Sequence, residues 1–175
     1  MPATASRKFV AAICFLAIAG LIATADQLIK NQIVADFKMY EVRPFFGELI
    51  QLTYVLNDSA AFSFGFGLTG VFTLISSMAT VLLIWFITVK SSSNMWSIMA
   101  AVLLGGVLGN LIDRIFRSPG AGLGKVVDYI QIPFNFPIFN IADIAIVSMA
   151  ILGALLVMLG YNVGKPGKLD KAKDD

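Results

Sequence analysis

Apolar residues gather into four long runs, separated by polar segments of very different lengths. The runs cover about residues 9–25, 68–89, 95–114 and 138–161. Each is close to the roughly 20 apolar residues that a helix needs to cross a bilayer core of about 30 Å. Backbone N–H and C=O groups find no water in lipid, so each run must satisfy them internally as a helix. The pattern predicts an all-α integral membrane protein with four transmembrane helices.

Composition supports a membrane protein and excludes several other classes. Of the 175 residues, 58% are hydrophobic and 14% are charged, whereas soluble domains carry about 25% charged residues. The net charge of +2 and the lack of a basic patch with interleaved aromatic residues exclude a nucleic-acid partner. The single cysteine, Cys14, excludes an internal disulfide and a multi-cysteine zinc site. We interpret it as a small apolar side chain.

The first apolar run has two interpretations. Arg7 and Lys8 precede it, and it ends in Ala23-Thr24-Ala25, a small-residue pattern that is typical of a cleaved signal peptide. However, the run is longer than the usual apolar region of such a peptide, about 7–15 residues. We therefore expect a helix that is retained in the mature protein.

The loops predict how the chain crosses the membrane. Lys and Arg are almost equally divided between the two sides, while most acidic residues lie on one side. Because cytoplasmic loops favour Lys and Arg, we expect both termini in the cytoplasm. Residues 1–164 would form a single membrane-embedded domain, with an extracytoplasmic segment at about 26–67 and a flexible cytoplasmic tail at 165–175.

The extracytoplasmic segment has a pattern that favours β-structure. Residues 48–56 mix β-branched and aromatic side chains with partial alternation, as a strand does. Asn57, Asp58 and Ser59 then indicate a turn. We expect a small β-rich cradle on the membrane surface.

Two aspartates stand in strongly apolar surroundings. Asp128 lies between Val127 and Tyr129, and Asp143 opens the fourth apolar run. An ionisable group at membrane depth costs about 2.5–3.5 kcal/mol on insertion scales, so it usually has a partner or a function. The chain has no histidine, so acid–base chemistry must use carboxylates, Lys, Tyr or Cys.

Further polar residues occupy the predicted helix ends and loops on the same membrane face, which is typical of a functional site. Some have structural interpretations. Asp26 and Lys30 are four residues apart and could form a surface ion pair or support the site. Asn140 and Asp143 have the spacing of a helix N-cap and its third residue. The full set beside the two aspartates is Asp26, Lys30, Asn57, Asn110, Asp113, Arg114 and Asn140.

These residues permit several kinds of chemistry. Two carboxylates held close in a dry site share one proton and can activate water, as in aspartic proteases. A Ser-Lys pair could use Lys30, and a magnesium site could use Asp113, Asp128 and Asp143. The acids could also line the aqueous cavity of a transport or scaffold protein, although no internal repeat supports a transporter. Gly105 and Gly109 indicate close helix packing.

Five segments together resemble the bacterial lipoprotein signal peptidase (signal peptidase II) family. The resemblance extends over nearly the whole chain in the same order and spacing. The matching segments are residues 26–30, 57–63, 105–114, 126–129 and 139–143.

The resemblance implies an intramembrane aspartic endopeptidase of the bacterial cytoplasmic (inner) membrane, with four transmembrane helices and a β-rich extracytoplasmic cradle. Such enzymes cut the signal peptide of diacylglyceryl-modified prolipoproteins just before the lipidated cysteine. The expected partners are these prolipoproteins and membrane lipids, and we expect a monomer without metal or cofactor. The family's catalytic pair falls on Asp128 and Asp143, near the extracytoplasmic face. Its supporting residues fall on Asn57, Asn110, Arg114, Asn140, Asp26 and Lys30, with Asp113 in the same segment as Arg114.

The chain departs from the family pattern in two places. Asp58 and Ser59 stand where the family usually has Thr-Gly after the loop asparagine. Residues 118–124, before Asp128, form a longer and more glycine-rich loop. This loop is either a mobile flap or a simple insertion, and we expect the insertion.

Overall fold

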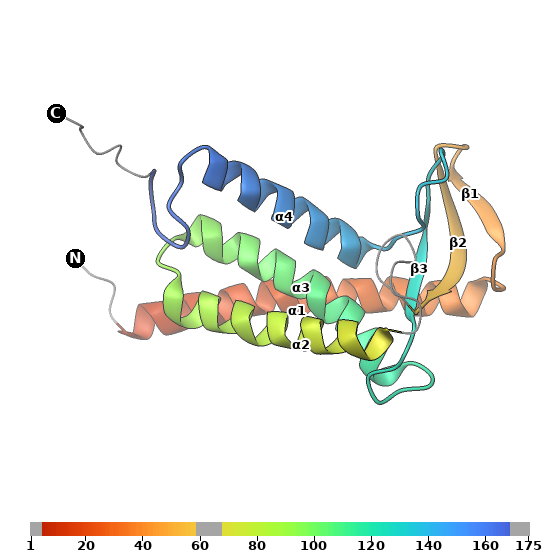
Figure 1. The fold of residues 1–175 in the computed structure, drawn as a ribbon, viewed down its shortest axis with the longest axis horizontal. Coiled ribbons are helices and arrows are strands. Elements are labelled where there is room, and N and C mark those ends of the chain that lie inside the picture. The colour runs from red at the N-terminus through yellow and green to blue at the C-terminus, as the bar shows by residue number, and fades with distance from the viewer. Residues whose placement is uncertain (1–4, 59–67, 169–175) are drawn as a thin grey trace.

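The computed structural model describes residues 5–58 and 68–168, and it shows a helix bundle with a small sheet at one end (Figure 1). Four helices of the described part are long and apolar enough to cross a membrane, which confirms the predicted fold class. The elements are α1 (Ala5–Asp36), β1 (Val42–Phe46), β2 (Ile50–Asn57), α2 (Thr69–Trp85), the π-helical η2 (Phe86–Lys90), α3 (Asn94–Phe116), β3 (Val126–Gln131) and α4 (Ile141–Met158).

Helix α3 is the centre of the bundle. In its most apolar stretch 61% of the residues are buried, against 17% in α1 and 6% in the helix formed by α2 and η2 and in α4. The outer helices therefore turn most of their apolar surface away from the protein, as expected for helices that face lipid. A multi-pass membrane protein follows from this distribution.

Small residues let α1 approach α3 closely. A Cβ atom on Gly105 would lie 2.7 Å from the Cβ of Ile22, and one on Gly109 would lie 2.5 Å from Oδ2 of Asp26. Neither position has room for a larger side chain, so the predicted packing role of these glycines is confirmed. The close approach also brings Asp26 against α3.

The ends of several elements differ from the sequence prediction. Helix α1 does not stop at residue 25 but continues to Asp36, because Asp26 and Lys30 are completely buried within the bundle rather than starting a polar loop. The segment that follows the first helix, expected at about 26–67, therefore begins after residue 36 rather than at 26. Helix α4 starts at Ile141 rather than 138, since Asn140 caps it.

The sheet contains the predicted strand and two others. The order is β1-β2-β3 and both pairs are antiparallel. Strand β2 matches the prediction for residues 48–56, whereas β1 and β3 were not anticipated. Asp128, expected in a connection, lies in β3 opposite Val55. The sheet lies where α4 begins, at the opposite end of the bundle from the start of α1 (Figure 1).

Some sequence predictions fall outside these residues. Most of the segment 57–63 and positions 169–175 of the expected tail lie outside the described residues. The division into a domain of residues 1–164 and a flexible tail stays a prediction, as does the retention of the first helix.

Candidate active site

Asp128 is buried in β3 and bound by two amide side chains. Its side chain is 2% exposed. Asn57 donates to Oδ2 at 2.7 Å, and Asn140 donates to Oδ1 at 2.6 Å. The pKa of Asp128 is raised to about 7, mainly by burial and next by the negative charge of Asp143. A carboxyl group with this pKa is partly protonated at neutral pH.

Asp143 lies in the first turn of α4, within a capping box. Oδ1 of Asn140 accepts from the backbone N–H of Asp143 at 3.0 Å, and the backbone N–H of Asn140 donates to Oδ2 of Asp143 at 3.1 Å. The N-cap interpretation is confirmed. Asn110 on α3 donates to the other carboxylate oxygen at 2.8 Å. Both carboxylate oxygens of Asp143 therefore accept N–H donors, from Asn110 and from Asn140.

The hydrogen-bond partners fix which way both amide groups point. A lysine ammonium has no acceptor, so Lys30 must donate to Oδ1 of Asn110, at 2.8 Å. The amino group of Asn110 is then left for Asp143. In the same way, Oδ1 of Asn140 accepts from a backbone N–H, and its amino group is left for Asp128. Each candidate carboxylate thus receives an N–H donor whose direction is set by its neighbours.

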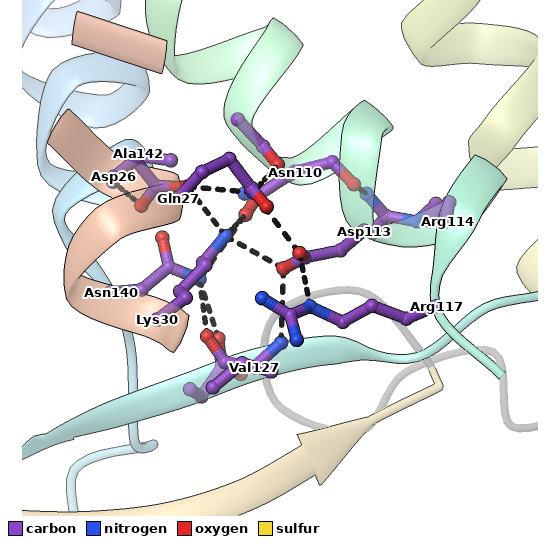
Figure 2. Close-up of polar contacts among 12 residues, drawn as sticks. Asp26, Gln27, Lys30, Asn110, Asp113, Arg114, Arg117, Val127, Asn140 and Ala142 are labelled. Atoms are coloured by element: carbon purple, nitrogen blue, oxygen red, sulfur yellow. Dashed lines mark hydrogen bonds and ion pairs between the residues drawn. The ribbon is translucent and has the colours of Figure 1, made fainter. Parts of the chain in front are cut away.

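Lys30 is the centre of a buried charge cluster, which Figure 2 shows in close-up. Its Nζ lies 2.8 Å from Asp26 and 2.9 Å from Asp113, and all three side chains are completely buried. With Asn110, these two acids use the three donors of the ammonium group. The surface ion pair considered for Asp26 and Lys30 is therefore wrong, because both side chains are buried. Their supporting role beside the site stays a prediction.

The cluster also joins the segments that carry the candidate aspartates. Asp113 accepts from the backbone N–H of Val127, next to Asp128, at 3.2 Å. Asp26 accepts from the backbone N–H of Ala142, next to Asp143, at 3.2 Å (Figure 2). The buried charges on α1 and α3 thereby hold β3 and the start of α4 in place.

Two members of this cluster were missed from the sequence. Gln27 donates to Asp113 at 3.0 Å, and Arg117 donates to the same carboxylate at 2.6 Å. Arg117 is four residues beyond Asp113, so helical spacing could have indicated it. For Gln27, the only signal in the sequence was its position next to Asp26.

The proposed magnesium cluster does not form. Asp113 is engaged by Lys30 and Arg117, while Asp128 and Asp143 bind amide groups. Within residues 5–58 and 68–168, no three His, Cys, Asp or Glu side chains are grouped so that they could hold a metal ion. Asp113, Asp128 and Asp143 therefore do not form the magnesium site that was considered.

A cavity of about 1000 Å³ joins this polar site to an apolar surface. Its apolar wall includes Ile144, Val147 and Ile151, which follow one face of α4 away from the sheet. A concave, mostly apolar cavity with a few polar groups is typical of a ligand-binding site. Its polar end is lined by Asn57, Asp58, Asn110, Arg114, Asp128 and Asp143.

Arg114 belongs to the cavity wall rather than to the charge cluster. Its Nη1 donates to the backbone carbonyl of Asn110 at 3.3 Å. In the part of the chain that the structure describes, none of the ion pairs involves Arg114. The side chain is therefore placed to contact a molecule in the cavity.

Comparison with known proteins identifies the family. Residues 18–159 match the family described as signal peptidase (SPase) II. The chain belongs to this family. The lipoprotein signal peptidase of Leifsonia xyli subsp. xyli is 40% identical over 159 residues, which cover 90% of this chain and 73% of that protein. The lipoprotein signal peptidase of Mycobacterium avium is 35% identical, over 91% of this chain and 88% of the relative.

Solved structures agree with this membership. A bacterial membrane enzyme solved by the in meso method at 2.3 Å resolution superimposes with a TM-score of 0.75 and 25% identity. The match covers 90% of this chain and 94% of that one. The resemblance to signal peptidase II is confirmed, and the transport or scaffold alternative is set aside.

Proposed function

We propose that this chain is the aspartic endopeptidase that removes the signal peptide of diacylglyceryl-modified prolipoproteins, with Asp128 and Asp143 as its catalytic pair. Family membership and relatives that are lipoprotein signal peptidases support the reaction. One observation supports the residues most directly. The two carboxylates come from β3 and α4, bind the same Asn140, and line the polar end of one cavity.

We assign the two carboxylates different roles from their surroundings. Asp128, whose pKa is raised to about 7, is the acid that starts the reaction with a proton. Asp143 takes the remaining role of the base, and both of its oxygens accept N–H hydrogen bonds, from Asn110 and Asn140. A protonated carboxyl oxygen still accepts one hydrogen bond while its O–H donates elsewhere. The contacts of Asp128 therefore allow its proton to point into the cavity.

The reaction follows from these roles. Asp143 takes a proton from a water molecule as the water oxygen attacks the scissile carbonyl carbon, and Asp128 gives its proton to the carbonyl oxygen. When the resulting tetrahedral intermediate collapses, the C–N bond breaks and Asp143 returns its proton to the departing amine. Asp128 regains its own proton from the hydroxyl group of the intermediate. This is general acid–base catalysis by a carboxyl pair.

The proposed reaction needs an orientation in the membrane that gives exported precursors access to the site. We place the sheet, Asp128 and Asp143 at the extracytoplasmic face of the bacterial cytoplasmic membrane, with both termini in the cytoplasm. The acidic residues that gather at this end and the site's position at the start of α4 are consistent with this orientation. Prolipoproteins are its proposed partners.

A cleavage assay tests the proposed reaction. Purified protein in neutral detergent micelles should convert a diacylglyceryl-modified precursor into two fragments, with the cut just before the lipidated cysteine by mass spectrometry. The rate should stay within about twofold when EDTA is added, because the pair activates water through carboxylates alone. An intact precursor, or a cut at another bond, would contradict the proposal.

Arg114 gives a second test. We expect Arg114→Lys to lower kcat/KM by about tenfold, because lysine keeps the charge but loses the planar fork that can bind two oxygen atoms at once. The assay is cleavage of the same lipidated precursor. Arg43→Lys is the matched control, since Arg43 is an exposed residue of β1 that pairs with Glu41. Full activity of the Arg114→Lys variant would show that only charge matters at this position.

A further inference from the structure

An ion pair extends the sheet at the mouth of the cavity. Asn57 and Val126 are the last paired residues of β2 and β3 at this end, so Asp58 and Lys125 occupy the next step of the antiparallel ladder. Nζ of Lys125 lies 3.2 Å from Oδ2 of Asp58, and the side chains are 43% and 23% exposed. The two charges therefore face each other across the strands while both remain open to solvent.

Only the acidic partner belongs to the cavity wall. Asp58 lines the cavity, as does its neighbour Asn57, which donates to Asp128. Lys125 is not part of the wall. The backbone of Asp58 is fixed as well, because its carbonyl accepts from Oγ1 of Thr69 at 2.6 Å. The carboxylate of Asp58 is thus held at the rim of the site, next in sequence to Asn57, which donates a hydrogen bond to Asp128.

Two parts of the cavity wall differ in chemistry. Ile144, Val147 and Ile151 form an apolar part of the wall on α4, and Asp58 lines the cavity beside the sheet, where it follows Asn57 of β2. A precursor whose apolar signal segment follows α4 must extend its polar residues, beyond the scissile bond, towards the sheet. These residues are the ones that meet the charge of Asp58.

We propose that Asp58 makes the enzyme select by charge among the residues that follow the lipidated cysteine, disfavouring acidic side chains, and that Lys125 moderates this selection. This inference rests on the proposed function. Because an exposed ion pair is weak and screened by salt, Lys125 reduces the field of Asp58 without cancelling it. The other charged residues of the cavity wall, Arg114, Asp128 and Asp143, surround the scissile bond itself.

The test compares three lipidated precursors that differ only in the residue after the lipidated cysteine, which is Lys, Gln or Glu. In neutral micelles at low salt we expect the wild type to cut the Lys precursor about fivefold faster than the Glu precursor, measured as kcat/KM. Asp58→Asn should bring the ratio of the Lys to the Glu precursor to about one. Lys125→Gln should at least roughly double it, because the carboxylate loses its counter-charge. High salt should reduce the ratio in the wild type.

The two variants predict opposite changes, which a general loss of structure cannot produce. Glu41 is a partly exposed acid that pairs with Arg43, and Glu41→Gln is the control, which should keep the wild-type ratio. An unchanged ratio in Asp58→Asn, or a lower ratio in Lys125→Gln, would overturn the proposal. If the Asp58→Asn variant cuts none of the precursors, the ratio measured with the Lys125→Gln variant decides whether the proposal holds. If the wild type cuts no lipidated precursor, the proposed function itself fails.

Discussion

Replacing either Asp128 or Asp143 with asparagine is expected to lower kcat for the lipidated precursor by about 10²–10⁴-fold, the usual effect of losing a general acid or base. Neither amide can supply the missing role, because a carboxamide does not exchange a proton near neutral pH. The two losses should be similar in size, since each carboxyl group has its own step in the proposed reaction. Single-turnover cleavage of the precursor in micelles measures the effect.

Both variants should still insert and fold. Asparagine has the shape of aspartate, but its amino group will face an N–H donor, from Asn57 or Asn140 at position 128 and from Asn110 or Asn140 at position 143. An unmatched buried donor costs about 1–3 kcal/mol. Thermal unfolding in detergent checks this cost. Asp36→Asn is the control, because Asp36 is exposed at the end of α1 and binds only exposed neighbours. Near-normal turnover in either variant would show that the catalytic assignment is wrong.

The pH profile of the wild type separates the two roles. Because Asp128 must carry a proton and its pKa is raised to about 7, activity should fall as pH rises through about 7. If Asp128 acted as the base instead, activity would rise with pH through about 7. Retained activity well above pH 8 would contradict the assignment of Asp128 as the acid.

The transmembrane part of the fold could be predicted because the bilayer sets both helix length and composition. The end of α1 could not, because polarity at Asp26, Gln27 and Lys30 looks the same in sequence whether the residues face solvent or a buried partner. Their partners lie on α3, about 80 residues away along the chain. Only the folded bundle shows that these charges are neutralised inside it.

The sheet and the site were predictable to different degrees. Strand β3 was missed because Asp128 interrupts an apolar stretch that would otherwise indicate a buried strand. The capping role of Asn140 followed from local spacing, which is short-range information. The direction of the Asn110 amide could not be predicted, since it depends on Lys30, which is distant in the sequence.

The lipid of the substrate should have the other large effect on the rate. We expect an unmodified precursor peptide to be cut about a hundredfold more slowly than the lipidated one, in kcat/KM at matched micelle concentration. Each buried CH₂ group contributes roughly 0.8 kcal/mol, so two acyl chains hold the peptide at the membrane surface far more strongly than its polar residues do. The apolar wall along α4, where Ile144, Val147 and Ile151 are 47%, 54% and 56% exposed, connects the bilayer to the carboxylates.

A third peptide distinguishes membrane attachment from positioning. It carries the same diacylglyceryl group on a cysteine that is moved three residues away from the original cleavage site. If the lipid places the scissile bond at the depth of Asp128 and Asp143, this peptide should be cut beside its new cysteine and not at the old position. Cleavage at the old position would mean that the lipid only concentrates the substrate. Equal rates for the lipidated and unmodified precursors would contradict the lipid-dependent specificity, yet would leave the carboxylate chemistry intact, because that chemistry acts on the peptide bond alone.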